Sequence, residues 1–175
     1  MNKILVVVDM QNDFIDGVLG SEQAVQIADK VACKINAFDG EIIVTYDTHF
    51  SNYLETAEGK KLPVVHCVKG TTGWELNVNV ERALKDKKYS VIEKPNFGSP
   101  VELPSLIRSK YGDFTGEIHF IGVCTDICVV SNAIILKANF PEAEIFVDSA
   151  CCAGVTVEKH KAALETMRSC QINVY

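Results

Sequence analysis

A chain of 175 residues with 47% hydrophobic residues can build one domain with a sizeable core but is short for two domains. Its net charge of −6 and the lack of a dense Lys/Arg cluster argue against a nucleic-acid partner, and no apolar run approaches the roughly 18 residues of a membrane span. The 7 cysteines include no C-x-x-C pair, which is typical of reduced thiols in the cytoplasm.

Strand-like and helix-like segments alternate along the chain. The first, at 3–10, is a short valine-rich run that predicts a buried strand, and apolar residues at three- and four-residue spacing over 24–38 predict an amphipathic helix. The later segments are predicted as strand 40–49, helix 78–89, strand 90–97, helix 102–112, strand 117–123, helix 126–140, strand 143–152, helix 156–170 and an edge segment at 172–175. This alternation predicts a single α/β domain over 1–175, with three layers and a central parallel sheet of five or six strands.

The longest stretch without a predicted element runs from His49 to about Trp74. A loop of that length inside a compact domain is usually functional or disordered. Because this one contains two histidines and several acidic residues, we expect a functional loop.

Polar side chains follow the predicted strands at their carboxyl ends, where the ligand sites of open α/β sheets lie. In strand order they are Asp9, then Asp47 and His49, then Lys94, then Cys124 to Cys128, and finally Asp148. An Asp, a Lys and a Cys at three strand ends form a candidate catalytic set.

Cys124 and Cys128 lie between a predicted strand and a predicted helix, and four roles are open for them: core thiols, a redox pair, metal ligands or a nucleophile. Cys128 falls in the first turn of the helix, where unpaired N–H groups and the helix dipole favour a thiolate and can stabilise an oxyanion. A thiol that only packs in the core is the alternative, and a redox pair has no supporting motif.

Asp9 and Lys94 each have a catalytic and an ordinary interpretation. Asp9 follows a hydrophobic strand, and desolvation would raise its pKa, which suits a general base. The ammonium of Lys94 could hold Asp9 and Cys128 in their charged forms and stabilise a developing oxyanion. The ordinary interpretations are an aspartate that caps a turn and a solvated lysine at a strand end.

Asp47, His49 and His66 suit a divalent metal ion such as Zn, Fe or Mn, because two imidazoles and a carboxylate leave positions open for water or substrate. Glu55 and Glu58 lie in the same loop and could add a carboxylate. Histidines that are only hydrogen-bonded within the fold are the alternative.

Five motifs occur together in one order: "VVVDMQNDF", "DTH", "HCVKGTTGWEL", "EKPNFGS" and "GVCTDICVVSNA". In these motifs the chain resembles the isochorismatase-like cysteine hydrolases from residue 4 to about residue 160, and within that superfamily it is most similar to the nicotinamidases. The resemblance implies the isochorismatase-like hydrolase fold and a small-molecule amide substrate. Hydrolysis of nicotinamide to nicotinate and ammonia is the first expectation, and another small amide, carbamoyl or ureido compound is the alternative substrate.

The resemblance assigns a catalytic triad to Asp9, Lys94 and Cys128. Cys128 would attack the amide carbonyl, Asp9 would pass the thiol proton to the leaving ammonia, and water would hydrolyse the resulting thioester. It also implies a cis peptide before Cys124, which would aim the N–H groups of Cys124 and Cys128 at the oxyanion. A silent binding or redox protein of the same fold is a further alternative, and the three triad residues together argue against it.

The resemblance also places a divalent metal ion on Asp47, His49 and His66, where it would hold the pyridine nitrogen of the substrate. Glu58 is the nearest match by spacing to a fourth ligand that some nicotinamidases use.

Substrate binding in this family also uses aromatic walls. Phe14 matches one of them. Nicotinamidases generally carry a second aromatic residue where this chain has Pro63, and Trp74 is a candidate replacement from another position. Family habit and the apolar helix after Cys128 predict a homo-oligomer.

Overall fold

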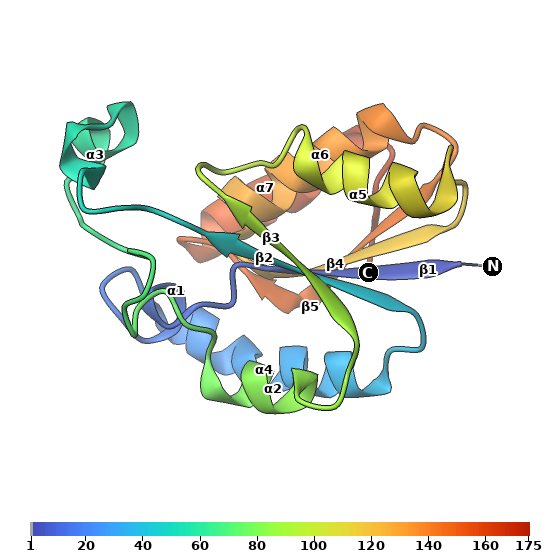
Figure 1. The fold of residues 1–175 in the computed structure, drawn as a ribbon. Helices are drawn as coiled ribbons and strands as arrows, with labels where there is room; N and C mark the ends of the chain where they lie inside the picture. Colours follow the sequence, from blue (N-terminus) through green and yellow to red (C-terminus); the bar gives the residue numbers. More distant parts are fainter. Residues whose placement is uncertain (1) are drawn as a thin grey trace.

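A twisted parallel sheet forms the middle of the computed structural model, which describes residues 2–175 (Figure 1). The strand order is β3-β2-β1-β4-β5-β6, and every neighbouring pair runs parallel. The strands are β1 (Lys3–Val8), β2 (Glu41–Asp47), β3 (Tyr89–Lys94), β4 (Glu117–Val123), β5 (Glu144–Ala153) and β6 (Asn173–Val174). The prediction of a parallel sheet of five or six strands is confirmed, with six strands.

Helices cover both faces of the sheet, so the predicted three-layer α/β/α architecture is also confirmed. In Figure 1, α5, α6 and α7 lie on one face, and α2 and α4 lie on the other. The helices are α1 (Asn12–Ile15), α2 (Glu22–Ala37), α3 (Ala57–Lys61), α4 (Val78–Leu84), α5 (Glu102–Tyr111), α6 (Val130–Asn139) and α7 (Val157–Ser169). No helix among residues 2–175 combines the length and the apolar character needed to cross a bilayer.

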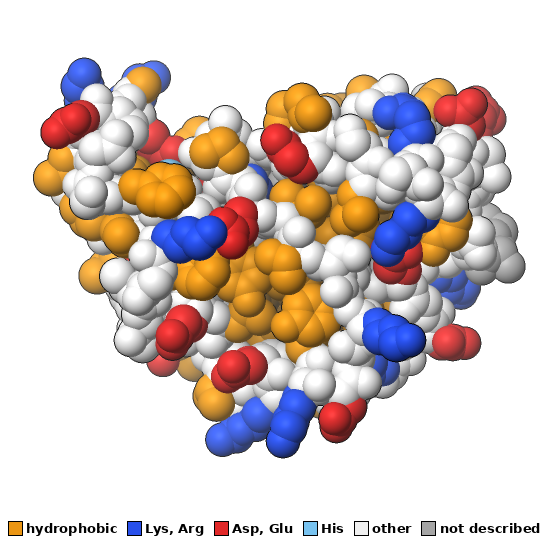
Figure 2. All heavy atoms as spheres, in the orientation of Figure 1, with side chains coloured by type: hydrophobic (Ala, Val, Ile, Leu, Met, Phe, Trp, Pro, Cys, Tyr) orange, Lys and Arg blue, Asp and Glu red, His pale blue; other side chains and the backbone are white. Residues whose placement is uncertain are grey.

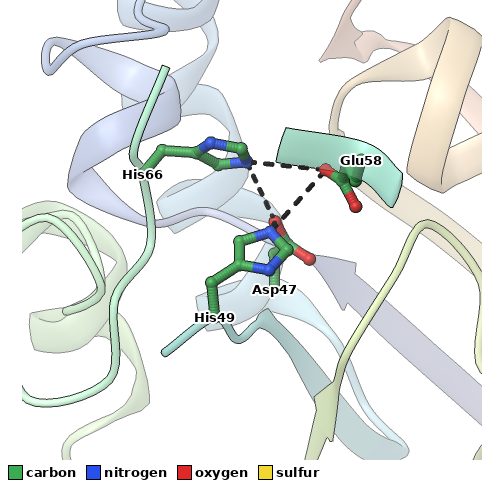
Figure 3. Close-up of side chains that lie close together, drawn as sticks. All are labelled: Asp47, His49, Glu58 and His66. Atoms are coloured by element: carbon green, nitrogen blue, oxygen red, sulfur yellow. Dashed lines mark ion pairs between the residues drawn. The ribbon is translucent and has the colours of Figure 1, made fainter. Parts of the chain in front are cut away.

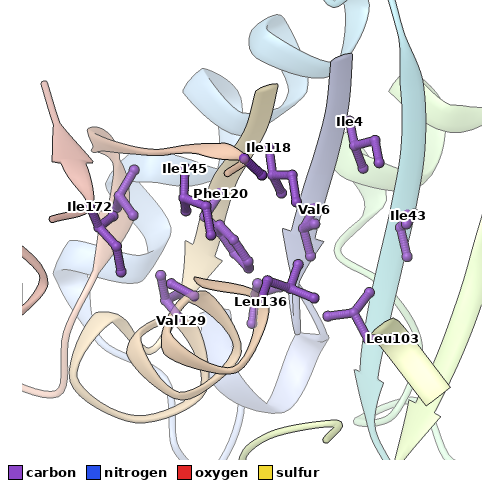
Figure 4. Close-up of a cluster of buried hydrophobic side chains, with 14 of the residues drawn as sticks. Ile4, Val6, Ile43, Leu103, Ile118, Phe120, Val129, Leu136, Ile145 and Ile172 are labelled. Atoms are coloured by element: carbon purple, nitrogen blue, oxygen red, sulfur yellow. The ribbon is translucent and has the colours of Figure 1, made fainter. Parts of the chain in front are cut away.

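The central strand β1 divides the hydrophobic core into two halves. Its alternate side chains point to opposite faces, as the two-residue period of a strand requires. Ile4, Val6 and Val8 pack under α5 and α6, in the cluster that Figure 4 shows, whereas Leu5 and Val7 pack toward α2 and α4. All five are fully buried, which explains why this strand reads as a continuous apolar run.

The strand register brings the polar strand ends to one edge of the sheet. Val8 pairs with Thr45 and with Gly122, and Asp47 pairs with Lys94. Gly122 has a φ of +116°, and a Cβ atom at this position would collide with the carbonyl oxygen of Val8. A glycine is therefore needed where β4 approaches β1 beneath the site.

Several short elements differ from the prediction, among them the short helix α1, which was not predicted. The stretch predicted as irregular contains a 3₁₀ turn at Tyr53–Glu55 and the helix α3, which projects from the body in Figure 1. The helix predicted from Asp126 begins as a π-helical turn at Thr125–Val129, and α4 ends at Leu84. The 3₁₀ turn, α3 and the π-helical turn are too short to show a hydrophobic period, and the charged residues after Leu84 carry no apolar stripe.

Candidate active site

Asp9, Lys94 and Cys128 meet at the carboxyl edge of the sheet. The Lys94 Nζ atom lies 2.6 Å from Asp9 Oδ2 and 3.4 Å from Cys128 Sγ, to which it donates a hydrogen bond. Thr45 donates a hydrogen bond of 2.6 Å to the other Asp9 oxygen, and Lys94 also donates to the carbonyl of Asn96. The structure thus brings together three residues from the ends of β1, β3 and β4.

Burial and the neighbouring charges shift the pKa values of these three groups. It raises the pKa of Asp9, and the nearby Asp47 adds to the rise, while Lys94 opposes it. Burial alone would lower the pKa of Lys94, but the charges of Asp9, Cys128 and Asp47 raise it well above its ordinary value. Burial also raises the pKa of Cys128 well above its ordinary value, so the resting sulfur is a thiol beside an ammonium–carboxylate pair.

The π-helical turn presents Cys128 to a cavity. The Val123–Cys124 peptide is cis, as the resemblance implies, and the Cys124 carbonyl accepts hydrogen bonds from the N–H groups of Ile127 and Val129. Two contacts tie this turn to the start of α7: Thr125 Oγ1 lies 2.8 Å from His160 Nδ1, and Asp126 accepts a hydrogen bond from the N–H of Val155.

A second polar cluster consists of Asp47, His49, Glu58 and His66, which point toward one another in Figure 3. Asp47 Oδ2 lies 3.0 Å from His49 Nε2 and 3.4 Å from His66 Nε2. Glu58 Oε1 lies 3.7 and 3.9 Å from the same two nitrogens. One ligand atom from each residue lies within 4.8 Å of the others, so the structure brings together the three predicted metal ligands and the fourth candidate.

The surroundings of this cluster fit a divalent cation. His66 donates from Nδ1 to the Val64 carbonyl at 2.7 Å, which leaves Nε2 as the acceptor that faces the cluster. The Nε2 atom of His49 is buried and, although Asp47 Oδ2 lies 3.0 Å away, it makes no hydrogen bond among the described residues. Burial raises the pKa of Asp47, but the two histidines and Lys94 more than offset this and lower it, so the carboxylate stays charged. Two imidazole nitrogens and two carboxylates are ligands that Zn, Fe and Mn accept.

The metal cluster adjoins the triad, and Asp47, Glu58, His66 and Cys128 line one cavity of about 500 Å³. Lys94 Nζ lies 3.5 Å from Asp47 Oδ1, so the two sites share a wall. In Figure 2 a notch separates the projecting α3 segment from the body, with histidine and acidic atoms visible at its base. The cavity lining includes Asp47, Glu58, His66, Cys124 and Cys128, together with the apolar side chains of Phe14, Leu62, Phe97 and Ile127.

Two sequence-derived candidates lie elsewhere. Trp74 does not line the cavity, because its indole donates to Thr48 and its ring packs 4.9 Å from that of Tyr46. In this structure Trp74 therefore lies outside the cavity, away from the place of the missing aromatic wall. Asp148 is not at a strand end, since β5 continues to Ala153, and it instead pairs with Lys34 at 2.9 Å.

Phe97 and Gln11 were not predicted to belong to the site. Phe97 lines the cavity from the segment after β3. The only feature of the sequence that could have indicated it is its position, three residues after Lys94. Gln11 is fully buried, accepts from the Asp47 N–H and donates to the Asp47 carbonyl, so it fixes the backbone of a metal-cluster residue. Gln11 lies inside the motif "DMQNDF", but nothing in that motif indicates its partner.

Comparison with known proteins identifies the family of this chain. Residues 3–175 match the isochorismatase domain family. The chain belongs to the isochorismatase family. Among curated relatives, this family member is 27% identical over 191 residues to the nicotinamidase/pyrazinamidase of Mycobacterium tuberculosis, covering 98% of this chain and 97% of the relative.

Solved structures show the same fold. The nicotinamidase/pyrazinamidase of Bacillus subtilis superimposes on this isochorismatase-family chain with a TM-score of 0.86 at 26% identity, covering 99% of each chain. The pyrazinamidase of Pyrococcus horikoshii, solved in complex with zinc, gives a TM-score of 0.85 at 25% identity and covers 100% of this chain and 99% of its own.

Proposed function

We propose that this protein is a cysteine-dependent amidohydrolase that converts nicotinamide to nicotinate and ammonia. The observation that carries the proposal is the ion pair of Asp9 and Lys94 in contact with Cys128, which lines the same cavity as Asp47, Glu58 and His66 of the metal cluster. The family match and the nicotinamidase relatives support a hydrolase of amide carbon–nitrogen bonds.

In the proposed reaction, Cys128 Sγ forms a bond to the amide carbonyl carbon while Asp9 takes the thiol proton. The tetrahedral intermediate collapses, the carbon–nitrogen bond breaks, and Asp9 returns the proton to the leaving ammonia. A water molecule then gives a proton to Asp9 and attacks the thioester. The carbon–sulfur bond breaks, the acid is released, and Asp9 returns the proton to the Cys128 sulfur. The Lys94 ammonium stabilises the negative charge that develops beside it.

The metal cluster, the aromatic residues and the backbone N–H groups around the cavity would orient the substrate. Asp47, His49, His66 and Glu58 would hold a divalent metal ion, Zn, Fe or Mn, and when bound this ion would supply a Lewis-acid contact to the ring nitrogen of the substrate. Phe14 and Phe97 would bind the faces or edges of the ring, and the backbone N–H groups of Cys124 and Cys128 would serve the oxyanion.

The test of the substrate is a comparison of two amides. We expect ammonia release from nicotinamide to be much faster than from benzamide, which has the same shape but lacks the ring nitrogen that the metal cluster would orient. Equal rates on both would contradict the metal-held ring. Turnover of only carbamoyl or ureido compounds would favour the alternative substrate class.

Metal binding has a readout apart from activity. A saturating Zn²⁺ concentration of about 100 times Kd should stabilise the folded protein by about 2.7 kcal/mol, seen as a higher melting temperature than in EDTA. His49→Ala should abolish this stabilisation. His119→Ala is the matched control, because His119 lies on β4 beside Glu117, outside the cavity lining, and should respond like the wild type.

Phe97→Ala should weaken substrate binding. An aromatic contact contributes about 1 kcal/mol beyond buried area, so KM should rise about fivefold with little change in kcat. Trp74→Phe is the control, because Trp74 packs outside the cavity and its replacement should leave KM unchanged. A raised KM for Trp74→Phe and an unchanged one for Phe97→Ala would reverse the assignment of the aromatic wall.

The pH dependence follows from the states of Asp9 and Cys128. Asp9 must be deprotonated to accept the thiol proton, and burial raises its pKa above 3.8, so kcat/KM should fall with decreasing pH at a midpoint above 3.8. Because the pKa of Cys128 is raised above 9.0, the thiol form should persist through neutral pH. A pH–rate profile with its acid midpoint at or below 3.8 would contradict Asp9 as the buried base.

Assembly and location are further parts of the proposal. A homo-oligomer is supported by the edge strand β3, where Tyr89 and Val91 are exposed hydrophobic residues. Figure 2 shows hydrophobic side chains gathered in the middle of one face of the molecule. A monomer in light scattering would remove this part. A reducing compartment such as the cytoplasm is supported by the 7 cysteines, all of them free in the structure, with Cys33 and Cys170 exposed.

A further inference from the structure

Asn132 is a fully buried polar side chain one helical turn after Cys128, on α6. Its amide makes three hydrogen bonds. Nδ2 donates to the Cys128 carbonyl at 2.8 Å and to the Phe97 carbonyl at 3.1 Å, and Oδ1 accepts from the Ser99 N–H at 2.9 Å. One bond is local within the helix, and the other two reach a segment more than 30 residues away in sequence.

The segment that Asn132 reaches continues from the catalytic lysine. Lys94 ends β3, its ammonium donates to the Asn96 carbonyl, and Phe97 forms a wall of the cavity. The segment packs closely on α6, since a Cβ atom on Gly98 would lie only 2.6 Å from Ile135 Cδ1. Ser99 then accepts from the Leu103 N–H and so anchors the first turn of α5.

These contacts close a ring through the site. The backbone leads from Lys94 to Phe97 and Ser99. The side-chain amide of Asn132 joins this segment to the Cys128 carbonyl by hydrogen bonds. The ring is completed by the hydrogen bond from Lys94 to the Cys128 sulfur. An amide that is fully buried and uses both its donor and its acceptor groups holds its partners in one arrangement, because each partner would lose a hydrogen bond if it moved.

We propose that Asn132 is a positioning residue that fixes the nucleophile turn against the Lys94–Ser99 segment. This inference rests on the proposed role of Cys128 as nucleophile. A displacement of about 1 Å between reacting groups can cost about 100-fold in rate, so a side chain that sets the distance between sulfur, ammonium and cavity wall controls turnover without touching the substrate.

Two variants distinguish the hydrogen bonds of Asn132 to Phe97 and Ser99, called the bridge here, from its local bond to the Cys128 carbonyl. Asn132→Ala removes all three hydrogen bonds. Asn132→Ser keeps a hydroxyl that can bond to the carbonyl four residues earlier but is too short to reach Phe97 and Ser99. The matched control is Asn139→Ala, because Asn139 lies on the same helix and makes the same kind of bond, to the Ile135 carbonyl at 3.0 Å, without reaching the site.

The measurements are kcat and KM on nicotinamide, thermal stability, and the rate at which iodoacetamide alkylates Cys128, located by peptide mass. Both Asn132 variants should lose at least about tenfold in kcat. They should also alkylate several-fold more slowly, because the sulfur no longer lies beside the Lys94 ammonium, which favours the thiolate. Asn139→Ala should match the wild type in kcat and in alkylation.

Wild-type kcat and alkylation in folded Asn132→Ser would overturn the inference, because the local bond would then be sufficient. Variants that do not fold, or that lose only stability, would also overturn it and leave Asn132 with a purely structural role. If the wild type does not turn over nicotinamide but the alkylation rates still separate the Asn132 variants from Asn139→Ala, the proposed function fails and the positioning role stands.

Discussion

Replacing Cys128 with alanine is expected to lower nicotinamide turnover by a factor on the order of 10⁴ to 10⁶, the size of effect seen when a nucleophile is removed. The sulfur is the only atom of the triad that forms a bond to the substrate carbon in the proposed reaction, and no other described thiol makes a hydrogen bond to Lys94. Ammonia release by purified protein measures the effect.

The fold should tolerate this change. Cys128 contributes one sulfur to a large core cluster, so the loss in stability should be about 1 kcal/mol. Cys152→Ala is the matched control, because Cys152 is a buried thiol in the same cluster, and burial also raises its pKa, yet it does not line the cavity. Wild-type turnover by both Cys128→Ala and Cys152→Ala would exclude Cys128 as the nucleophile.

Lys94→Met is expected to impair both stability and activity. It leaves the fully buried carboxylate of Asp9 without its cation, and breaking one partner out of a buried ion pair typically costs about 3–5 kcal/mol. Urea unfolding measures this loss. Lys69→Met is the control, because the Lys69–Glu93 pair is exposed and its removal should change stability by less than about 1 kcal/mol.

In Lys94→Met, kcat/KM should be lower and its pH dependence should be shifted. Lys94 lowers the pKa of Asp9 against the effect of burial, so its removal should raise that pKa further. A base with a higher pKa is protonated up to a higher pH, and the acid limb of kcat/KM should therefore move to higher pH. An unshifted limb together with wild-type stability would show that Lys94 does not act on Asp9.

Much of the fold follows from local patterns. β4 was predicted with the bounds that the structure has, because its apolar run lies between Gly116 and a polar turn, and the valine run of β1 predicts a strand buried on both faces. The triad follows from topology, since three parallel strands deliver Asp9, Lys94 and the Cys128 turn to one edge.

Other features depend on contacts between distant segments. The projecting helix α3 carries Glu58 to the histidines, but it is only five residues long and shows no hydrophobic period. Phe97 ends a predicted strand and Trp74 ends the long irregular stretch, and only the packing of Trp74 on Tyr46 shows which of the two aromatic residues lies outside the cavity. The bridge of Asn132 to Phe97 joins residues 35 positions apart, and no spacing rule predicts such a pair.

The central claim is that Cys128 hydrolyses the amide of nicotinamide, and its most direct test is a product measurement. Wild-type protein supplied with Zn, Mn or Fe is incubated with nicotinamide in parallel with Cys128→Ala, and nicotinate and ammonia are both quantified. The proposal predicts equal amounts of the two products from the wild type and none above background from the variant. No product from the wild type with any of the three metals, or equal product from both proteins, would contradict it.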